Sequence, residues 1–195
     1  MILHRKIVLA SSSPFRRELL ARLQLPFAVA APHIDEAAHI GEAAAATAQR
    51  LADAKAAAIL PAFADALIIG SDQIAEIDGE HIGKPGSHAA AIEQLRRMRG
   101  RTVVFHTALV LLDARSATSQ SRVIATNVRF REVSDAQIET YLEREQPYNC
   151  AGSAKSEGLG IALIAAIEGP DPNALIGLPL IALIDMLKNA GVEVL

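Results

Sequence analysis

The chain has 195 residues, of which 51% are hydrophobic and 21% are charged, and its formal net charge at pH 7 is −3. This length allows a substantial core, and we expect a single domain over residues 1–195. No apolar stretch approaches the roughly 18 residues of a membrane span, and the scattered arginines give no basic face for a long nucleic acid. The start of the chain shows no secretory-signal pattern. With Cys150 as the single cysteine, this favours a cytoplasmic location.

Apolar periodicity and turn residues predict alternating strands and helices. In chain order, the expected elements are a strand at residues 6–10, a helix at 15–23, a strand at 26–31, a helix at 42–60, a strand at 66–70, a hairpin at 74–82, a helix at 88–99, strands at 102–112 and 122–133, a helix at 135–145, a strand at 158–167 and a helix at 178–190. The two long strands are expected to pair antiparallel. This order predicts an α/β fold with a mixed sheet, in two lobes that flank a central cleft.

The first strand–helix junction carries the clearest functional signal. Pro14 suits the first helical position, and Ser12 or Ser13 suits the N-cap before it. Arg16 and Arg17 follow in the first helical turn, where the helix dipole disfavours a cation by roughly 0.3–1 kcal/mol. Backbone N–H groups, hydroxyls and guanidinium groups therefore converge on one helix start, which predicts an anion site, with phosphate as the expected anion. The competing interpretation is a solvated turn with two surface arginines.

Other polar residues indicate chemistry on a polyphosphate. Asp72 follows the apolar run at 66–70, where open α/β sheets place reactive side chains. Glu36 lies on a polar loop, and two carboxylates with several waters would suit Mg²⁺ bridging to phosphates. Lys84 lies in a short rigid loop and could hold a phosphate charge, whereas Lys55 has the pattern of a surface lysine on a helix.

A small-residue loop at 152–158 contains Lys155 and Glu157 and is suited to close backbone approach to a ligand. The chain lacks a Walker pattern, a Rossmann glycine fingerprint, a nucleophile elbow and a Cys/His dyad. Its polar residues therefore favour metal-assisted attack on a polyphosphate over covalent catalysis.

Seven short segments carry a resemblance to a known family. They are LASSSPFRRELL at 9–20, Asp35-Glu36, RLADAK at 50–55, IGSDQ at 69–73, GKP at 83–85, AGSAKSEGLG at 151–160 and IGLPL at 176–180. In this order they resemble the Maf family of nucleotide pyrophosphatases, over essentially the whole chain. The resemblance implies an elongated α/β fold related to inosine triphosphate pyrophosphatase, and hydrolysis of a nucleoside triphosphate to the monophosphate and pyrophosphate. It also implies a divalent metal cation (Mg²⁺ or Mn²⁺), a cytoplasmic location and a possible homodimer.

The resemblance assigns roles to individual positions, with Asp72 matching the family's proton acceptor. We expect catalytic roles for Asp72, Glu36, Lys84 and Lys55, metal binding by Asp72 and Glu36, and substrate binding by Ser13, Arg16 and Lys155.

Three further positions are expected to set substrate specificity. Members similar to dTTP/UTP pyrophosphatases carry Arg, Thr and Gln where this chain has Phe15, Gln73 and Glu157, whereas members similar to 7-methyl-GTP pyrophosphatases carry an aromatic residue, Gln and Glu. N7 methylation makes guanine cationic, so an aromatic face gains roughly 0.5–2 kcal/mol, and a glutamate accepts from N1–H and the amino group. We therefore expect 7-methyl-GTP as the substrate. The alternatives are a dTTP/UTP pyrophosphatase and a non-catalytic nucleotide-binding regulator of cell division.

Overall fold

The computed structural model describes residues 5–195, which fold around a seven-stranded mixed sheet. The strands are β1 (Lys6–Ala10), β2 (Phe27–Ala30), β3 (Ala66–Ile77), β4 (Glu80–Ile82), β5 (Thr102–Asp113), β6 (Thr118–Phe130) and β7 (Ile164–Glu168). The α-helices are α1 (Pro14–Ala21), α2 (Ala44–Ile59), α3 (His88–Met98), α4 (Asp135–Glu145) and α5 (Leu180–Asn189). The strand order is β2-β1-β3-β5-β6-β7, and β4 pairs with β3. The expected α/β class with a mixed sheet is confirmed.

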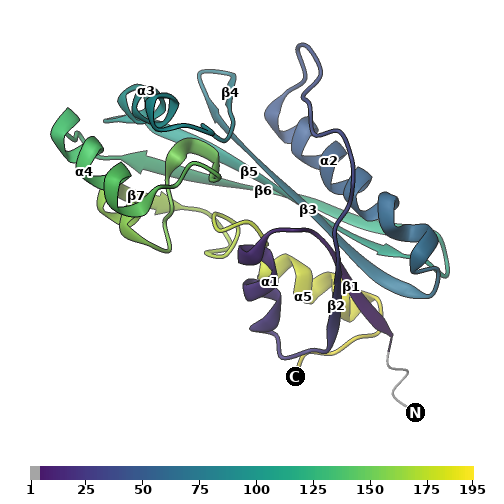
Figure 1. Ribbon diagram of the computed structural model, residues 1–195. Helices are drawn as coiled ribbons and strands as arrows, with labels where there is room; N and C mark the ends of the chain where they lie inside the picture. Colours follow the sequence, from purple (N-terminus) through teal and green to yellow (C-terminus); the bar gives the residue numbers. More distant parts are fainter. Residues whose placement is uncertain (1–4) are drawn as a thin grey trace.

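Three long strands, β3, β5 and β6, join the two lobes (Figure 1). One lobe contains β1, β2, α1 and α5, and the other contains β4, β7, α3 and α4, while α2 lies along the sheet. The long strands pair antiparallel over nearly their whole length, and β1 is parallel to both β2 and β3. None of the helices in residues 5–195 is long and apolar enough to cross a membrane.

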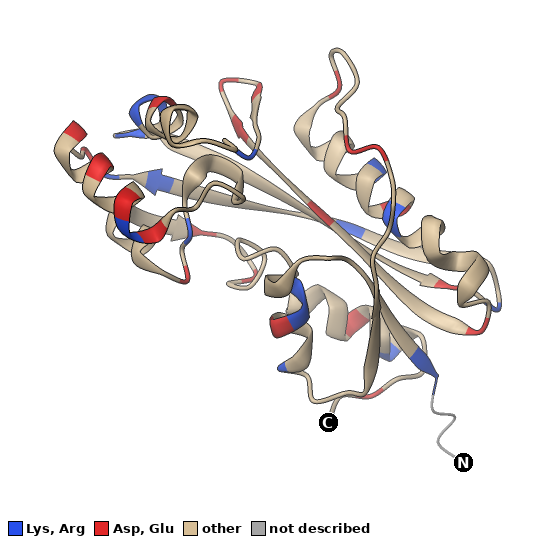
Figure 2. Ribbon diagram, in the orientation of Figure 1, with Lys and Arg blue, Asp and Glu red and all other residues tan. Residues whose placement is uncertain are grey.

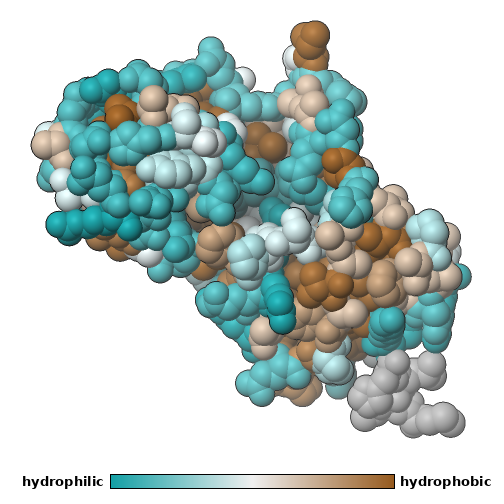
Figure 3. Space-filling view, in the orientation of Figure 1, coloured by the Kyte–Doolittle hydropathy of each residue, from teal (hydrophilic) through white to brown (hydrophobic). Residues whose placement is uncertain are grey.

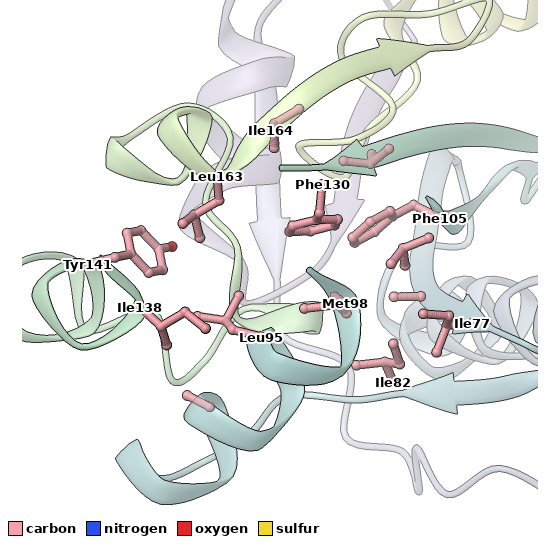
Figure 4. Close-up of a cluster of buried hydrophobic side chains, with 14 of the residues drawn as sticks. Ile77, Ile82, Leu95, Met98, Phe105, Phe130, Ile138, Tyr141, Leu163 and Ile164 are labelled. Atoms are coloured by element: carbon pink, nitrogen blue, oxygen red, sulfur yellow. The ribbon is translucent and has the colours of Figure 1, made fainter. Parts of the chain in front are cut away.

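Each lobe has its own buried hydrophobic cluster, and a third cluster lies between α2 and the sheet. In the α3–α4 lobe, Phe105 and Phe130 lie next to each other and pack with side chains from both helices (Figure 4). In the other lobe, Leu19 and Leu20 of α1 pack into the cluster that also contains the apolar face of α5. Small alanine side chains let α2 lie close to the sheet. The two lobes therefore have separate hydrophobic cores.

Besides the strand expected at 122–133, which spans Thr118–Phe130, two expected strands differ from the structure. The strand expected at 66–70 continues to Ile77, so Asp72 lies within β3 rather than after its end. The antiparallel ladder with β5 extends to Glu76 and holds this part of the chain extended. In the stretch 158–167, residues Leu159–Leu163 form a 3₁₀ helix and the strand begins at Ile164. Local turn bonds explain this second difference, because Gly158 N–H donates to Lys155 O and Ile161 N–H donates to Gly158 O.

The edge of β3 that faces β1 changes partner halfway along the strand. Strand β1 ends opposite Gly70, and the residues of β3 that pair with β4 start at Ala75. Among residues 5–195, no strand pairs with residues 71–74 on this edge, although β5 pairs with them on the other. Asp72 and Gln73 therefore lie at a gap in the sheet, between the two lobes.

Candidate active site

A cleft of about 480 Å³ opens at this gap. Its charged and hydroxyl lining comes from the first strand–helix junction, the loop before α2, α2 itself, β3 and the loop after β4. It includes Ser11, Ser12, Ser13, Arg16, Glu36, Lys55, Asp72 and Lys84. Part of its apolar lining comes from the cluster drawn in Figure 4 and includes Ile82, Phe105, Val128, Phe130 and Ile164. Figure 2 shows charged residues on α1 and α2, which flank the middle of the sheet. A cleft with a charged part and an apolar part suits a ligand that combines phosphates with a flat base.

Lys55 connects the two carboxylates of the cleft. Its Nζ lies 2.5 Å from Oδ1 of Asp72 and 2.7 Å from Oε1 of Glu36. The side chains of Lys55 and Asp72 are only 6% and 9% exposed, respectively, so this pair is largely shielded from bulk water. The helix pattern alone indicated a surface lysine, and the structure shows that this interpretation was wrong, because α2 turns Lys55 toward β3.

Gly70 permits the close packing of α2 that brings Lys55 to Asp72. A Cβ built on Gly70 would lie 2.2 Å from the backbone oxygen of Ala52 and 3.1 Å from Cβ of Ala56. Any larger residue at this position would push α2 away from β3. The glycine two residues before Asp72 therefore sets the distance between catalytic candidates on different elements.

Arg16 is fixed at the start of α1. Ser13 is the N-cap residue and its Oγ accepts from Arg16 N–H at 3.4 Å, while Nε of Arg16 donates to the carbonyl of Gly177 at 2.8 Å. Burial lowers the pKa of Arg16, although the negative charges of Asp72 and Glu36 act to raise it. Arg17 is exposed and lies outside the lining of the cleft, so the junction supplies one guanidinium to the site rather than two.

Glu36 is the more exposed of the two carboxylates. Its burial acts to raise its pKa, but the hydrogen bond from Lys55 and the charges of Lys55, Lys84 and Arg16 together lower it. Glu36 is therefore ionised at neutral pH. Lys84 is exposed on its loop and contributes its charge across the cleft.

The residues present fit a metal ion that binds together with a polyphosphate. Among residues 5–195, no group of three or more His, Cys, Asp or Glu side chains is arranged to hold a metal. Asp72 and Glu36 nevertheless meet around one cationic group, the ammonium of Lys55. Mg²⁺ is commonly held by one or two carboxylates, with phosphate oxygens and water completing its shell.

The three expected specificity residues all line the cleft. The ring of Phe15 is half-buried, and Glu157 is exposed at the cleft with a hydrogen bond of 3.4 Å from the hydroxyl of Ser156. The amide nitrogen of Gln73 donates to the hydroxyl of Thr107 and to two backbone carbonyls. The structure thus brings Phe15, Gln73 and Glu157 to one cavity from three distant parts of the chain.

Lys155 contacts protein groups at the margin of the cleft. Its Nζ forms an ion pair of 2.8 Å with Glu145, and this hydrogen bond raises the pKa of Lys155. The same Nζ lies 5.9 Å from the centre of the Phe15 ring. Lys155 therefore holds the loop that carries Glu157 against α4.

The loop at 171–177 was assigned no role from the sequence. Its Gly177 carbonyl accepts from Nε of Arg16 at 2.8 Å and from the hydroxyl of Ser71 at 3.0 Å. Buried Asp171 accepts from the backbone N–H of Asn173 at 2.9 Å and of Ile181 at 2.7 Å, which ties the loop to the start of α5. The Asp-Pro-Asn sequence predicts a turn here. Only the three-dimensional structure shows which side chains donate hydrogen bonds to the carbonyls of this loop.

Comparison with known proteins shows the family of this chain. The model of the Maf family, described as Maf-like protein, matches residues 6–190. The 7-methyl-GTP pyrophosphatase of Methylobacillus flagellatus is 61% identical over 189 residues, which cover 97% of this chain and 98% of that protein. The proteins of the same name from Thiobacillus denitrificans and Cupriavidus metallidurans are 57% and 58% identical, over 97% and 95% of this chain and 94% and 93% of their own lengths. The chain belongs to the Maf family.

Proposed function

We propose that this protein, acting as one domain, hydrolyses 7-methyl-GTP to 7-methyl-GMP and pyrophosphate. The observation that carries the proposal is a single cleft that joins the Lys55–Asp72–Glu36 cluster to an apolar wall, with Phe15 and Glu157 in its lining. The relatives named as 7-methyl-GTP pyrophosphatases support the choice of substrate, because they align with this chain over nearly its whole length.

In this proposal Asp72 is the proton acceptor for the attacking water. Its Oδ1 accepts from Lys55, which orients the carboxylate and leaves Oδ2 for the water. The water oxygen forms a new P–O bond, the P–O bond of the α–β bridge breaks, and the proton passes to Asp72. Glu36, which also contacts Lys55, would hold a divalent cation together with Asp72. When bound, Mg²⁺ or Mn²⁺ would supply charge stabilisation to the phosphate oxygens.

The cationic side chains counter the remaining phosphate charge. Arg16 and Ser13 lie at the start of α1, where backbone N–H groups already favour an anion. Lys84 lies on the loop between β4 and α3, and it is close enough for its charge to lower the pKa of Glu36. Lys155 contributes by positioning the loop of Glu157, since its ammonium is paired with Glu145.

Base recognition in this proposal depends on the charge of 7-methylguanine. Phe15 offers an aromatic face to a cationic ring, which is worth roughly 0.5–2 kcal/mol. Glu157 accepts from N1–H and the amino group, in hydrogen bonds strengthened by its charge. A neutral pyrimidine provides neither the positive ring nor the two neighbouring donors.

A homodimer and a cytoplasmic location also belong to the proposal. Figure 3 shows hydrophobic residues gathered on the lobe that contains β1, β2 and α5, and Val29, Ile181 and Ile184 are exposed on elements of this lobe. This apolar surface supports self-association. Light scattering coupled to size-exclusion chromatography tests the dimer.

A substrate panel tests the proposed activity. Pyrophosphate release is measured with Mg²⁺ from 7-methyl-GTP, GTP, ITP, UTP and dTTP at equal concentrations. We expect the highest kcat/KM for 7-methyl-GTP and loss of turnover on addition of EDTA. A higher kcat/KM for UTP or dTTP would contradict the substrate assignment, and absence of turnover on all five would contradict the enzymatic role.

A further inference from the structure

We propose that Thr107 and the backbone carbonyls of Ala174 and Leu175 lock the amide of Gln73 in one orientation, so that Gln73 meets the base only as a hydrogen-bond acceptor. In this view Thr107 is a positioning residue for specificity. The inference deepens the proposed function and rests on it for the identity of the base, but the lock itself is a property of the free protein.

The contacts of Gln73 form a closed triangle with two neighbours. Nε2 of Gln73 donates to Oγ1 of Thr107 at 2.9 Å and to the carbonyl of Ala174 at 3.0 Å. The hydroxyl of Thr107 itself donates to the same carbonyl at 2.9 Å. A third acceptor, the carbonyl of Leu175, lies 2.9 Å from Nε2. The amide nitrogen is thus surrounded by three oxygens.

These partners determine which end of the amide faces inward. A side-chain amide has one end that donates and one that accepts, and the two ends have nearly the same shape. Backbone carbonyls accept only, so the NH₂ group must face Ala174 and Leu175. Rotation by 180° would place Oε1 against the two carbonyl oxygens. The remaining atom, Oε1, is left for the cleft that Gln73 lines, and no residue in the range 5–195 donates to it.

The frame around the amide is itself rigid. Thr107 is fully buried on β5, directly opposite Gln73 in the strand register. The loop that provides the two carbonyls is held at one end by Asp171 and at the other by the bonds that Gly177 accepts from Arg16 and Ser71. Thr107 closes this frame because its hydroxyl bonds both the amide and the loop. The orientation of Gln73 is therefore set before any ligand binds.

A fixed acceptor selects for bases with neighbouring donors. Guanine presents N1–H and an amino group side by side, with three N–H hydrogens in all, and the carboxylate of Glu157 together with Oε1 of Gln73 complements these donors. Uracil presents one N–H between two carbonyl oxygens, so an acceptor opposite either carbonyl is repulsive. An amide that could rotate would accommodate both bases. A locked amide presents only its acceptor, so this neutral side chain can discriminate guanine from uracil.

The substitution Gln73→Glu separates a locked amide from a free one. It keeps the acceptor and adds negative charge, which on a freely rotating side chain would favour a cationic base. In the locked frame it removes the NH₂ group and places a carboxylate oxygen against the carbonyls of Ala174 and Leu175. Because a buried acceptor left facing acceptors is unfavourable, we expect kcat/KM for 7-methyl-GTP to fall by at least about tenfold. An unchanged or higher value in a folded variant would overturn the lock.

Thr107 provides the matched pair of variants. Thr107→Val removes the hydroxyl at nearly constant shape, and Thr107→Ser retains it. We expect Thr107→Val to lower the ratio of kcat/KM for 7-methyl-GTP to that for UTP by about three- to tenfold, the usual effect of losing one neutral hydrogen bond, here the one to the amide of Gln73. Thr107→Ser should restore the ratio. An equal loss on both substrates would make Thr107 merely structural and overturn its role in specificity.

A measurement without substrate distinguishes failure of the lock from failure of the proposed function. The side-chain NH₂ signals of Gln73, assigned by their loss in Gln73→Glu, should exchange slowly with solvent in the free wild type and faster in Thr107→Val. Fast exchange in the wild type would overturn the lock whatever the substrate is. Slow exchange in a protein that prefers UTP would support the lock and contradict the assignment of 7-methyl-GTP.

Discussion

The ammonium of Lys55 lies 2.5 Å from Oδ1 of Asp72, and both side chains are almost fully buried where α2 packs on β3. A buried charge that loses its partner is strongly unfavourable, whereas removal of both charges is much less so. Lys55 therefore has two effects at once: it positions the carboxylate of Asp72 for the reaction, and it makes the stability of the fold depend on the pair.

Removal of the cation tests this dependence. We expect Lys55→Met to lower the free energy of unfolding at pH 7 by about 3 kcal/mol, because Asp72 stays buried without its counter-ion. The double variant Lys55→Met/Asp72→Asn should be less destabilised than the sum of the single variants. Chemical denaturation of the four proteins measures this difference. Strict additivity would show that the two side chains are not coupled.

The carboxylate itself is tested by Asp72→Asn. The amide keeps the size of the side chain but cannot take a proton from water, so we expect kcat to fall by roughly 10²–10⁴ while the fold is retained. Asp53→Asn, on the exposed side of α2, is the matched control and should leave kcat unchanged. Near-normal turnover in Asp72→Asn would remove Asp72 from the mechanism.

Arg16 is expected to act on substrate binding rather than on stability. Arg16→Ala removes a charge that the dipole of α1 disfavours by roughly 0.3–1 kcal/mol and that burial also disfavours. It also removes the bond from the charged guanidinium to Gly177, which is worth roughly 1.5–3 kcal/mol, so the effects on stability partly offset each other. We expect KM to rise about tenfold or more, with a melting temperature close to that of the wild type. Arg17→Ala is the control, because Arg17 is exposed outside the cleft. A large drop in melting temperature with unchanged KM would make Arg16 structural.

Glu36 predicts a pH dependence of stability. Its pKa is lowered from 4.5 in the folded protein, so the ionised group stabilises the fold at pH values above 4.5. This contribution should be lost as the pH falls below 4.5 and through the lower pKa of the folded state. We therefore expect the difference in unfolding free energy between wild type and Glu36→Gln to be present at pH 7 and to vanish in acid. Denaturation curves measured from pH 7 to pH 2 check this, and a constant difference across that range would contradict it.

Base choice is tested at the three specificity positions. Glu157→Gln keeps the shape but removes the charge, so its cost should fall mainly on 7-methyl-GTP, by about ten- to a hundredfold in kcat/KM. The combined change Phe15→Arg, Gln73→Thr and Glu157→Gln should move the preference toward UTP and dTTP. The measurement is the ratio of kcat/KM for 7-methyl-GTP to that for UTP. An equal loss on both substrates in Glu157→Gln would argue against a role for Glu157 in base recognition.

Local signals in the sequence were sufficient for much of the framework. The cap residue Ser13 with Pro14 marks the start of α1, and the capping box of Ser134 and Gln137 marks the start of α4. Apolar runs located most of the strands, because a strand that is buried on both faces has a nearly continuous hydrophobic sequence. Such signals depend only on residues that are close together in the chain, so they can be recognised without knowledge of the fold.

Contacts between distant segments could not be derived in the same way. On α2 almost every neighbour of Lys55 is a small alanine, so the apolar pattern does not show which side faces the sheet. Gln73 and the carbonyl of Ala174 are 101 residues apart in the chain, and no periodicity connects them. The position at which β1 ends, opposite Gly70, likewise depends on how β1 pairs with β3 rather than on the residues of β1 alone. The resemblance to the Maf family placed Lys55 at the cleft, and the physical reason for that placement came from the structure.

The change of partner along β3 also bears on how the protein avoids aggregation. An open strand edge is ordinarily a template on which another polypeptide can add, and long exposed edges are hazards for this reason. On β3 the open edge spans only residues 71–74, and β1 and β4 pair with the strand on either side of it. The recess of about 480 Å³ in front of it has room for a small molecule but not for an extended chain. The same interruption that admits a ligand is therefore too short and too enclosed to recruit a second protein.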